Sequence, residues 1–140
     1  MFNGVHSLSI KFLNLQSCNL YEIPLLNCFP SLEYLNISNN FLSNLKFLHT
    51  CEKLREIYIS NNKIKYLINL SKNENLQILD LSFNQIENFE TVALLCMNQN
   101  LQSLNLKVNP ISLRKSYKEN IFSLLFSIKY LDENVSKLNF

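Results

Sequence analysis

The chain has 140 residues, of which 47% are hydrophobic and 17% are charged, and this composition suits one domain with a substantial core. Thirteen Lys and Arg against eleven Asp and Glu leave a net charge of only +2, which argues against nonspecific nucleic-acid binding as the main activity. The single glycine, Gly4, excludes the glycine-rich loops that hold phosphates. Leucine and asparagine, with 27 and 22 copies, are the residues in clear excess.

Residues 1–9 offer only Phe2, Val5 and Leu8 as apolar cover for the segment that follows. They lack the features of a secretory signal, and no stretch of the chain approaches 18 continuous apolar residues. We therefore expect an intracellular protein, cytoplasmic or nuclear, with no membrane contact. Since the N-terminal cover is thin, self-association or a partner strand is expected at the edge near Ile10.

An eleven-residue pattern, L-x-x-L-x-L-x-x-N-x-L, occurs five times between residues 10 and 112. The copies begin at Ile10, Leu32, Leu54, Leu76 and Leu101, at spacings of 22, 22, 22 and 25 residues. Positions 1, 4, 6, 9 and 11 carry only Leu, Ile, Asn or Cys in all five copies. This period predicts an α/β fold, a right-handed leucine-rich repeat solenoid with a parallel concave sheet of about five strands.

Within each copy, positions 4 and 6 are expected to point inward from a short strand, because side chains alternate along a strand. The side chains at position 9 are expected to bond the backbones of neighbouring repeats as a ladder, which consists of Cys18, Asn40, Asn62, Asn84 and Asn109. The convex half repeats its apolar residues every three positions, which predicts 3₁₀ or short helical returns. The longer interval from Ile86 to Leu101 has room for an α-helix.

The four cysteines form no C-x-x-C pair, and the chain has only two histidines, so a zinc site is not expected. We expect reduced thiols, with three in the core of the convex side: Cys28, Cys51 and Cys96.

After Asn109-Pro110, the apolar spacing predicts an amphipathic capping helix from Arg114 to Ser127, and Leu131-Asp132 ends the cap. The expected organisation is a single domain over residues 1–140. It comprises a cover (1–9), five repeats (10–112), a C-terminal cap (113–132) and a tail (133–140). The basic residues Arg114, Lys115 and Lys118 are expected to form the solvated face of the cap helix.

From Ile10 to Asp132 the chain resembles the short intracellular leucine-rich repeat proteins of the 22-residue class. These include the leucine-rich acidic nuclear phosphoproteins, the spliceosomal A-prime protein, the leucine-rich regulatory subunit of protein phosphatase 1 and the axonemal outer-arm dynein light chain. The cap segment from Tyr117 to Asp132 is similar to that of the nuclear phosphoproteins, although Phe126 replaces a usual proline and their acidic tail has no counterpart in residues 133–140. The resemblance implies regulatory or assembly roles.

The outward positions 3, 5 and 7 of the strands form the concave face. Large side chains among them have two interpretations: cross-strand packing, or anchors for a protein partner, which we favour. The candidate partner-binding residues are Phe12, Tyr34, Asn36, Glu56, Tyr58, Ile78, Asp80 and Asn105. Tyr34 and Tyr58 are expected at their centre, with Tyr58→Ala weakening the partner while leaving the fold intact.

The expected function is therefore a protein–protein interaction adaptor that docks a partner on its concave face. One alternative is a ribonucleoprotein or nucleic-acid-associated assembly factor that binds through the basic cap, although direct contact with nucleic acid is disfavoured. Another is an axonemal or cytoskeletal structural subunit. Glu56 and Asp80 could lie side by side on neighbouring strands, but no pocket or third group accompanies them, and no Ser, His and acid can be grouped. We expect no enzyme, no cofactor, no metal and no small-molecule substrate.

Overall fold

The structure is a computed structural model that describes residues 9–24 and 29–133. The expected cover residues Phe2, Val5 and Leu8, the thiol of Cys28 and the tail beyond residue 133 lie outside the described residues.

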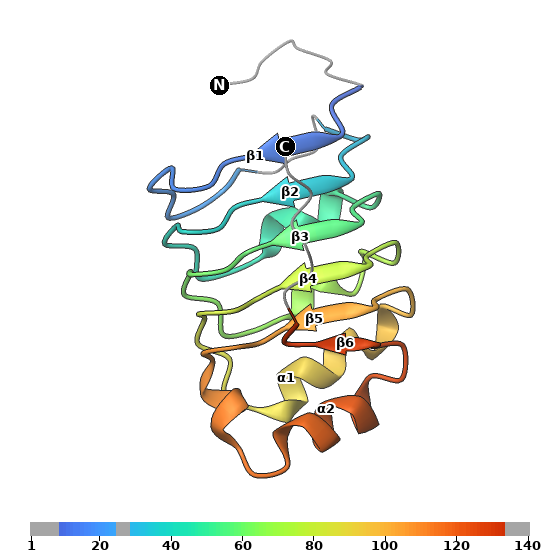
Figure 1. Ribbon diagram of the computed structural model, residues 1–140. Helices are drawn as coiled ribbons and strands as arrows, with labels where there is room; N and C mark the ends of the chain where they lie inside the picture. The colour runs from blue at the N-terminus through green and yellow to red at the C-terminus, as the bar shows by residue number, and fades with distance from the viewer. Residues whose placement is uncertain (1–8, 25–28, 134–140) are drawn as a thin grey trace.

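Six strands form one parallel sheet in which every strand pairs with its neighbours in chain order (Figure 1). Five come from the repeats and the sixth, unexpected one from the cap. They are β1 Phe12–Asn14, β2 Tyr34–Asn36, β3 Glu56–Tyr58, β4 Ile78–Asp80, β5 Ser103–Asn105 and β6 Tyr130–Leu131. The register aligns position 4 of each repeat, so Leu13, Leu35, Ile57, Leu79, Leu104 and Leu131 form one row.

Short helical segments return the chain behind the sheet, as the three-residue apolar spacing predicts (Figure 1). The return after β2 and the return after β3 are 3₁₀ helices, η1 Lys46–Thr50 and η2 Ile68–Leu70. The longer interval after Ile86 contains the expected α-helix, α1 Phe89–Ala93, followed by η3 Leu94–Met97. The side chain of Asn88 accepts a hydrogen bond from the Thr91 backbone N–H and so begins α1.

The cap helix is shorter than expected. The chain runs through η4 Pro110–Leu113 and then α2 Tyr117–Leu124, not from Arg114 to Ser127. Ser116, with φ of 54°, has a left-handed backbone that no α-helix can include, so the helix begins after it. Tyr117 and Ile121 of α2 lie in the core, whereas Phe126 is 92% exposed.

The core runs the length of the stack between the sheet and the returns. Position 4 and position 6 side chains are almost completely buried from β2 onward, and Leu35, Ile37, Ile57 and Ile59 all have 0% exposure. The first repeat differs, because Ile10, Leu13, Leu15, Leu20 and Ile23 are only partly buried. A hollow of about 260 Å³ lies against this end, and its lining is almost wholly apolar. The N-terminal end of the described core is therefore its most open part.

Every repeat turns away from its strand through a left-handed residue at position 8. The values of φ there lie between 54° and 57°, for Ser17, Asn39, Asn61, Phe83 and Val108. The chain achieves this turn five times without glycine, the residue that normally takes such a conformation.

Candidate functional site

The candidate residues lie on outward positions of adjacent strands, in the order that the repeat period predicts. Tyr34 lies opposite Phe12 on one side and opposite Glu56 on the other. Tyr58 lies opposite Asn36 and Asp80. Tyr34 and Tyr58 are therefore diagonal neighbours on β2 and β3, which is the arrangement expected from their places in the repeats.

Three aromatic rings form a column across β1, β2 and β3. The ring centroids of Phe12 and Tyr34 are 5.9 Å apart, and those of Tyr34 and Tyr58 are 5.3 Å apart. Interplanar angles of 44° and 43° make both contacts tilted pairs, a favourable geometry for aromatic rings. Cross-strand packing therefore accounts for a part of why these positions are aromatic.

Exposure differs sharply along this column. Phe12 is 57% exposed, whereas Tyr34 retains 7% and Tyr58 only 3%. A ring buried to that degree contributes to the packing of the protein, so the expectation that Tyr58→Ala leaves the fold intact does not suit this geometry. The accessible candidate surface comprises Phe12 and the half-buried side chains of Glu56, Ile78, Asp80 and Asn105.

The Tyr58 hydroxyl donates a hydrogen bond of 3.0 Å to the Glu56 carboxylate. Burial, followed by this bond and the charge of Glu56, raises the pKa of Tyr58 well above its ordinary value. Burial and the Glu56 charge also raise the pKa of Tyr34. The two hydroxyls therefore stay neutral at physiological pH, and Glu56 supplies the negative charge beside them.

Glu56 and Asp80 are diagonal, not directly opposite, because the register places Glu56 against Ile78. Asp80 Oδ1 accepts hydrogen bonds from the backbone N–H and the hydroxyl of Ser82, at 2.9 and 2.7 Å. These bonds hold the carboxylate in the turn after β4. The two carboxylates are therefore diagonal neighbours on β3 and β4, and that of Asp80 is already bonded by Ser82.

The position 5 amides have a local structural role that sequence reasoning missed. Asn36 Oδ1 accepts from the Ser38 N–H at 3.0 Å, and Asn105 Oδ1 accepts from the Lys107 N–H at 3.1 Å. Asn14 does the same for Gln16. Asn and Asp commonly form such turns, in which the side chain bonds a backbone group two residues later. Asn36 and Asn105 thus shape the strand ends, whatever else they contact.

The position 9 asparagines bond three segments of backbone at once. Asn62 donates to the Ile37 carbonyl of the previous repeat at 3.0 Å and accepts from the Leu42 N–H at 2.9 Å. Asn40 in the repeat before, and Asn84 and Asn109 in the two repeats after, make the equivalent bonds. Cys18 differs: its exposed thiol bonds the Gln16 carbonyl of its own repeat, and its N–H donates to Asn40.

A second asparagine ladder lies on the convex side, where no candidate was expected. Asn73 donates to the carbonyls of Leu48 and Cys51, and Asn98 donates to those of Leu70 and Asn73. Both asparagines are fully buried. The sequence signal is a polar residue three places before position 1 of the next repeat, on an otherwise apolar face.

The cap contributes Asp132, which completes the hydrogen bonds of the last repeat. Its Oδ1 accepts from the Leu106 N–H at 2.7 Å and from the Tyr117 hydroxyl at 3.3 Å. In earlier repeats the equivalent N–H donates to a backbone carbonyl of the next strand, as the Ile59 N–H does to the Asp80 carbonyl. A carboxylate therefore replaces a backbone acceptor where the regular repeats end.

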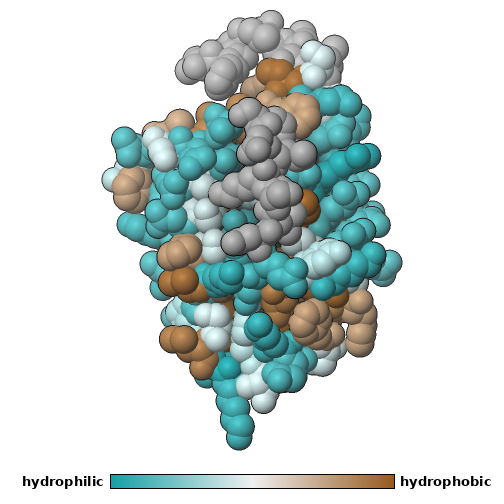
Figure 2. Space-filling view, viewed as in Figure 1, coloured by the Kyte–Doolittle hydropathy of each residue, from teal (hydrophilic) through white to brown (hydrophobic). Residues whose placement is uncertain are grey.

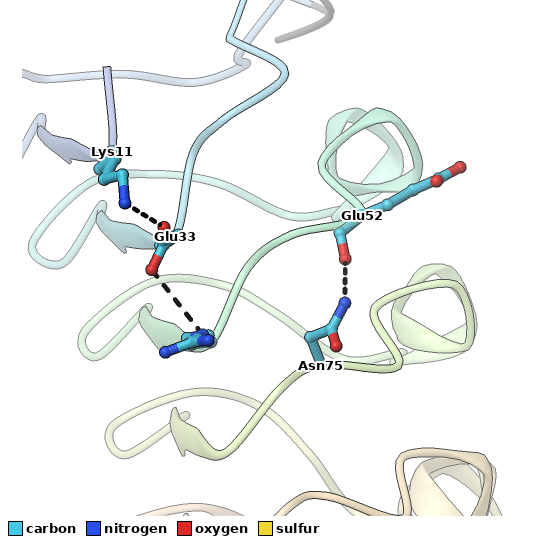
Figure 3. Close-up of polar contacts among 5 residues, drawn as sticks. Lys11, Glu33, Glu52 and Asn75 are labelled. Carbon is cyan, nitrogen blue, oxygen red and sulfur yellow. Dashed lines mark hydrogen bonds and ion pairs between the residues drawn. The ribbon is translucent and has the colours of Figure 1, made fainter. Parts of the chain in front are cut away.

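The edge at which the strands begin carries an alternating row of charges (Figure 3). Glu33 lies between Lys11 at 2.9 Å and Arg55 at 3.7 Å, so one carboxylate links three adjacent repeats. The hydrogen bond from Lys11 lowers the pKa of Glu33. Next to this row, Asn75 donates to the Glu52 carbonyl at 3.0 Å (Figure 3). Since these groups are largely exposed, the row contributes little to stability.

The cysteines divide between core and surface. Cys51 is buried as expected, but Cys96 is exposed, which corrects the expectation of a core thiol. With three extra residues, this repeat returns through α1 and η3, where Leu95 is buried and Cys96 is exposed. His49 is exposed on η1.

Within residues 9–24 and 29–133, no cluster of three potential metal ligands occurs. The same segments contain no helix with the length and hydrophobicity needed to cross a bilayer.

Comparison with known proteins agrees with this geometry. Residues 31–51 match the Leucine Rich Repeat model, and residues 52–94 match Leucine Rich repeats (2 copies). No curated protein matches the sequence. U2A′, from the Drosophila melanogaster SNF/U2A′ complex, is 22% identical with a TM-score of 0.77, over 91% of this chain and 75% of that chain.

Two bacterial structures are also similar. Internalin C2 from Listeria monocytogenes is 29% identical with a TM-score of 0.67, over 87% of this chain and 52% of its own. A leucine-rich repeat protein from Leptospira interrogans is 25% identical with a TM-score of 0.69, over 85% of this chain and 36% of its own. This chain thus spans about half of the first and about a third of the second.

Residues 31–94 match leucine-rich repeat models, and the described chain folds as a leucine-rich repeat solenoid similar to that of the U2A′ structure. Such a solenoid is a scaffold for protein interactions, and the fold is typically not enzymatic.

Proposed function

We propose that the protein is an adaptor that docks a protein partner on its concave face in a regulatory or assembly complex. The observation that carries this proposal is the composition of the accessible concave strip, defined here as Phe12, Glu56, Ile78, Asp80 and Asn105. Ile78 lies beside the carboxylates of Glu56 and Asp80 on β3 and β4, and the exposed ring of Phe12 lies on β1, on the far side of β2. Such a mixture of apolar anchors and like charges suits a partner that presents lysine or arginine near apolar side chains.

Tyr34 and Tyr58 have a supporting role in this proposal. Their tilted stacking fixes the base of the strip, and the Tyr58 hydroxyl holds the Glu56 carboxylate in place. A carboxylate held in one orientation loses less side-chain freedom on binding, which favours affinity. The partner then contacts Glu56 directly and reaches only the edges of the two tyrosine rings.

The test is affinity capture from native cells, followed by titration of a captured partner against purified variants. Glu56→Lys reverses a charge at the centre of the strip and is expected to weaken binding by roughly 2 kcal/mol. Lys65→Ala, at an exposed position away from the sheet, is the matched control and should bind as wild type. If Phe12→Ala with Glu56→Lys captures the same proteins at the same strength, the concave strip is not the docking surface.

Salt dependence separates a protein partner from the alternative of nucleic-acid binding through the cap. Arg114, Lys115 and Lys118 are exposed, but only Lys118 lies on α2, which corrects the expectation that all three share a helix face. Binding to phosphates through these side chains would weaken steeply between low and physiological salt, because counterions are released. Docking on the concave strip, which holds both apolar and acidic groups, is expected to change far less over the same range.

We also propose self-association through the open N-terminal end. The partly buried core of the first repeat and the apolar hollow beside Leu13 and Leu15 support it, because a second copy could cover both. Sedimentation over a concentration series should show dimers, and Ile23→Lys should return the protein to monomer with an unchanged circular dichroism spectrum. A monomer at every concentration would remove this proposal.

An intracellular setting, cytoplasmic or nuclear, is part of the same proposal. Cys18, Cys51 and Cys96 are free thiols in the structure, which suits a reducing compartment. Fluorescent fusion of the full chain, with an antibody against the native protein as control, would locate it directly.

A further inference from the structure

The chain leaves the sheet at a fixed point beside β5. Asp132 follows β6 with a φ of 59°, a left-handed backbone that ends the strand. Its N–H donates to the Leu104 carbonyl at 2.9 Å, and its carboxylate accepts from the Leu106 N–H. Two hydrogen bonds therefore fix the place from which residues 134–140, which we term the tail segment, continue.

The tail segment lies outside the described residues, but its sequence is informative. It reads Asn-Val-Ser-Lys-Leu-Asn-Phe, so Lys137 carries its only charge, and Val135, Leu138 and Phe140 are apolar. A lysine among apolar side chains is the chemistry that the concave strip suits in a partner. The chain thus contains a segment with the properties that its own strip requires of an occupant.

The distances allow the tail segment to lie along the strip. Adjacent strands are about 4.8 Å apart, so β3 with Glu56 lies roughly 10 Å from β5, and β1 with Phe12 lies roughly 19 Å away. Lys137 is five residues beyond Asp132, and Phe140 is eight residues beyond it. At about 3.3 Å per extended residue, these lengths are about 16 and 26 Å, and each exceeds the corresponding span.

Charge favours the same placement. The outward positions of the five repeats hold two carboxylates, Glu56 and Asp80, and one ammonium group, Lys107, so their net charge is −1, opposite to that of Lys137. Glu56 is half-buried and forms no ion pair within residues 9–24 and 29–133. On this side of the molecule, hydrophobic side chains lie among hydrophilic ones (Figure 2), which suits an occupant that carries both kinds.

Burial on the concave side supplies an independent observation. Ser38, at outward position 7 of the second repeat, is only 1% exposed, and Asn36, at position 5, is 5% exposed. The Ser38 hydroxyl has no hydrogen-bond partner in the part of the chain that the structure describes. A buried hydroxyl without a partner is unfavourable. The tail segment supplies polar side chains for this place in Ser136 and Asn139.

We propose that residues 134–140 dock on the concave strip of their own chain and block it until a partner displaces them. Lys137 pairs with the carboxylates of Glu56 and Asp80, and apolar side chains of the segment contact Ile78. Because the segment is tethered, its effective concentration at the strip is roughly millimolar, so weak contacts hold it there. The regulatory consequence rests on the proposed function, whereas docking of the tail segment does not. A partner's apparent Kd rises as the fraction of open strips falls.

Zero-length cross-linking of the full chain tests the contact directly. A carbodiimide joins an ammonium group to a carboxylate when the two are in contact, and mass spectrometry of the peptides locates the new amide bond. Lys137 should cross-link to Glu56 or Asp80. The ion pair of Lys11 with Glu33, at 2.9 Å, is the internal positive control. A product from the control pair without one from Lys137 to the strip would overturn the proposal.

Two further outcomes of the same experiment would also overturn it. An even spread of Lys137 products over exposed carboxylates, Glu119 of α2 among them, would show chance encounters in place of docking. Products that combine both isotopes, from a mixture of unlabelled and ¹⁵N-labelled chains, would assign the strip to a second copy. Intramolecular docking predicts products of one isotope, confined to the strip.

Amide chemical shifts of the full chain provide a second readout. Lys137→Ala should release the tail segment and shift the amide resonances of β3 and β4. Lys115→Ala, at an exposed cap lysine, is the matched control and should shift only its neighbours. Changes confined to the residues next to Lys137 would overturn the proposal. Neither readout involves a partner, so a docked segment without any captured partner refutes the proposed function alone, and the opposite result refutes this inference alone.

Discussion

Replacing Asn62 by leucine tests the asparagine ladder at the middle of the solenoid. The side chain of Asn62 lies within hydrogen-bond distance of four backbone groups: the Leu42 N–H and the carbonyls of Ile37, Ile59 and Ser60. Leucine is similar in size but can bond none of them, so the substitution removes hydrogen bonds without leaving a large cavity.

The magnitude follows from which groups keep another partner. The Ile37 carbonyl still accepts from Asn40, and the Ile59 carbonyl still accepts from Asn84. The Ser60 carbonyl keeps the Asn39 N–H. Only the buried Leu42 N–H loses its acceptor. One unsatisfied buried donor costs about 1–3 kcal/mol, so the free energy of unfolding should fall by about that amount.

Urea denaturation followed by circular dichroism measures this change, since a lower midpoint at constant slope reports lost stability. Asn75→Leu is the matched control, because its exposed amide bonds the Glu52 carbonyl alone and its loss should cost no more than about 0.5 kcal/mol. If Asn62→Leu is as stable as Asn75→Leu, the ladder does not stabilise the stack and the reasoning is refuted.

Two other predictions concern the cap. Burial, with the charge and hydrogen bond of Asp132, raises the pKa of Tyr117 above the value near 10 of an unfolded chain. Above about pH 10 the unfolded state therefore loses this proton first and stability falls. Tyr117→Phe should reduce the loss of unfolding free energy per pH unit by up to about 1.4 kcal/mol, as measured by urea denaturation at a series of pH values. An equal pH dependence in the wild type and the variant would contradict this prediction. Truncation after Pro110 removes the buried cap residues Ile121 and Leu131, together with Asp132, and exposes the last repeat. We therefore expect aggregation or noncooperative melting of the truncated chain. A truncated chain that is monomeric and melts cooperatively would show that the cap is dispensable.

The repeat period predicted the strands and returns well because each repeat buries the same positions against the next. Leu35 and Ile57 align in the sheet because they are 22 residues apart in a stack that advances one strand per period. Cys96 was misplaced for the same reason: three inserted residues change which side of the return faces the core. Periodicity predicts a position only as long as the period is kept.

The exposure of the candidate site could not be predicted from the pattern. Alternation places Tyr34 and Tyr58 on the outward face of the sheet, yet they are only 7% and 3% exposed, a degree of burial that spacing along the chain does not specify. The bond from Tyr58 to Glu56 likewise depends on rotamers that no spacing specifies. The sequence therefore predicts which side chains lie on the concave face, while the geometry determines how far each of them is exposed.

The excess of asparagine and the scarcity of glycine have one physical explanation. Strands of three residues leave many backbone groups without a strand partner, and a buried group of that kind must be bonded by a side chain. Asparagine offers a donor and an acceptor, and Asn62 uses both within the turns, while Asn98 donates to two carbonyls on the convex side. It also tolerates the left-handed backbone, as at Asn39 and Asn61, where glycine would otherwise be needed. Phe83 and Val108 take the same left-handed backbone at the next two turns without an amide, so the turn geometry itself is imposed by the repeat and not by asparagine.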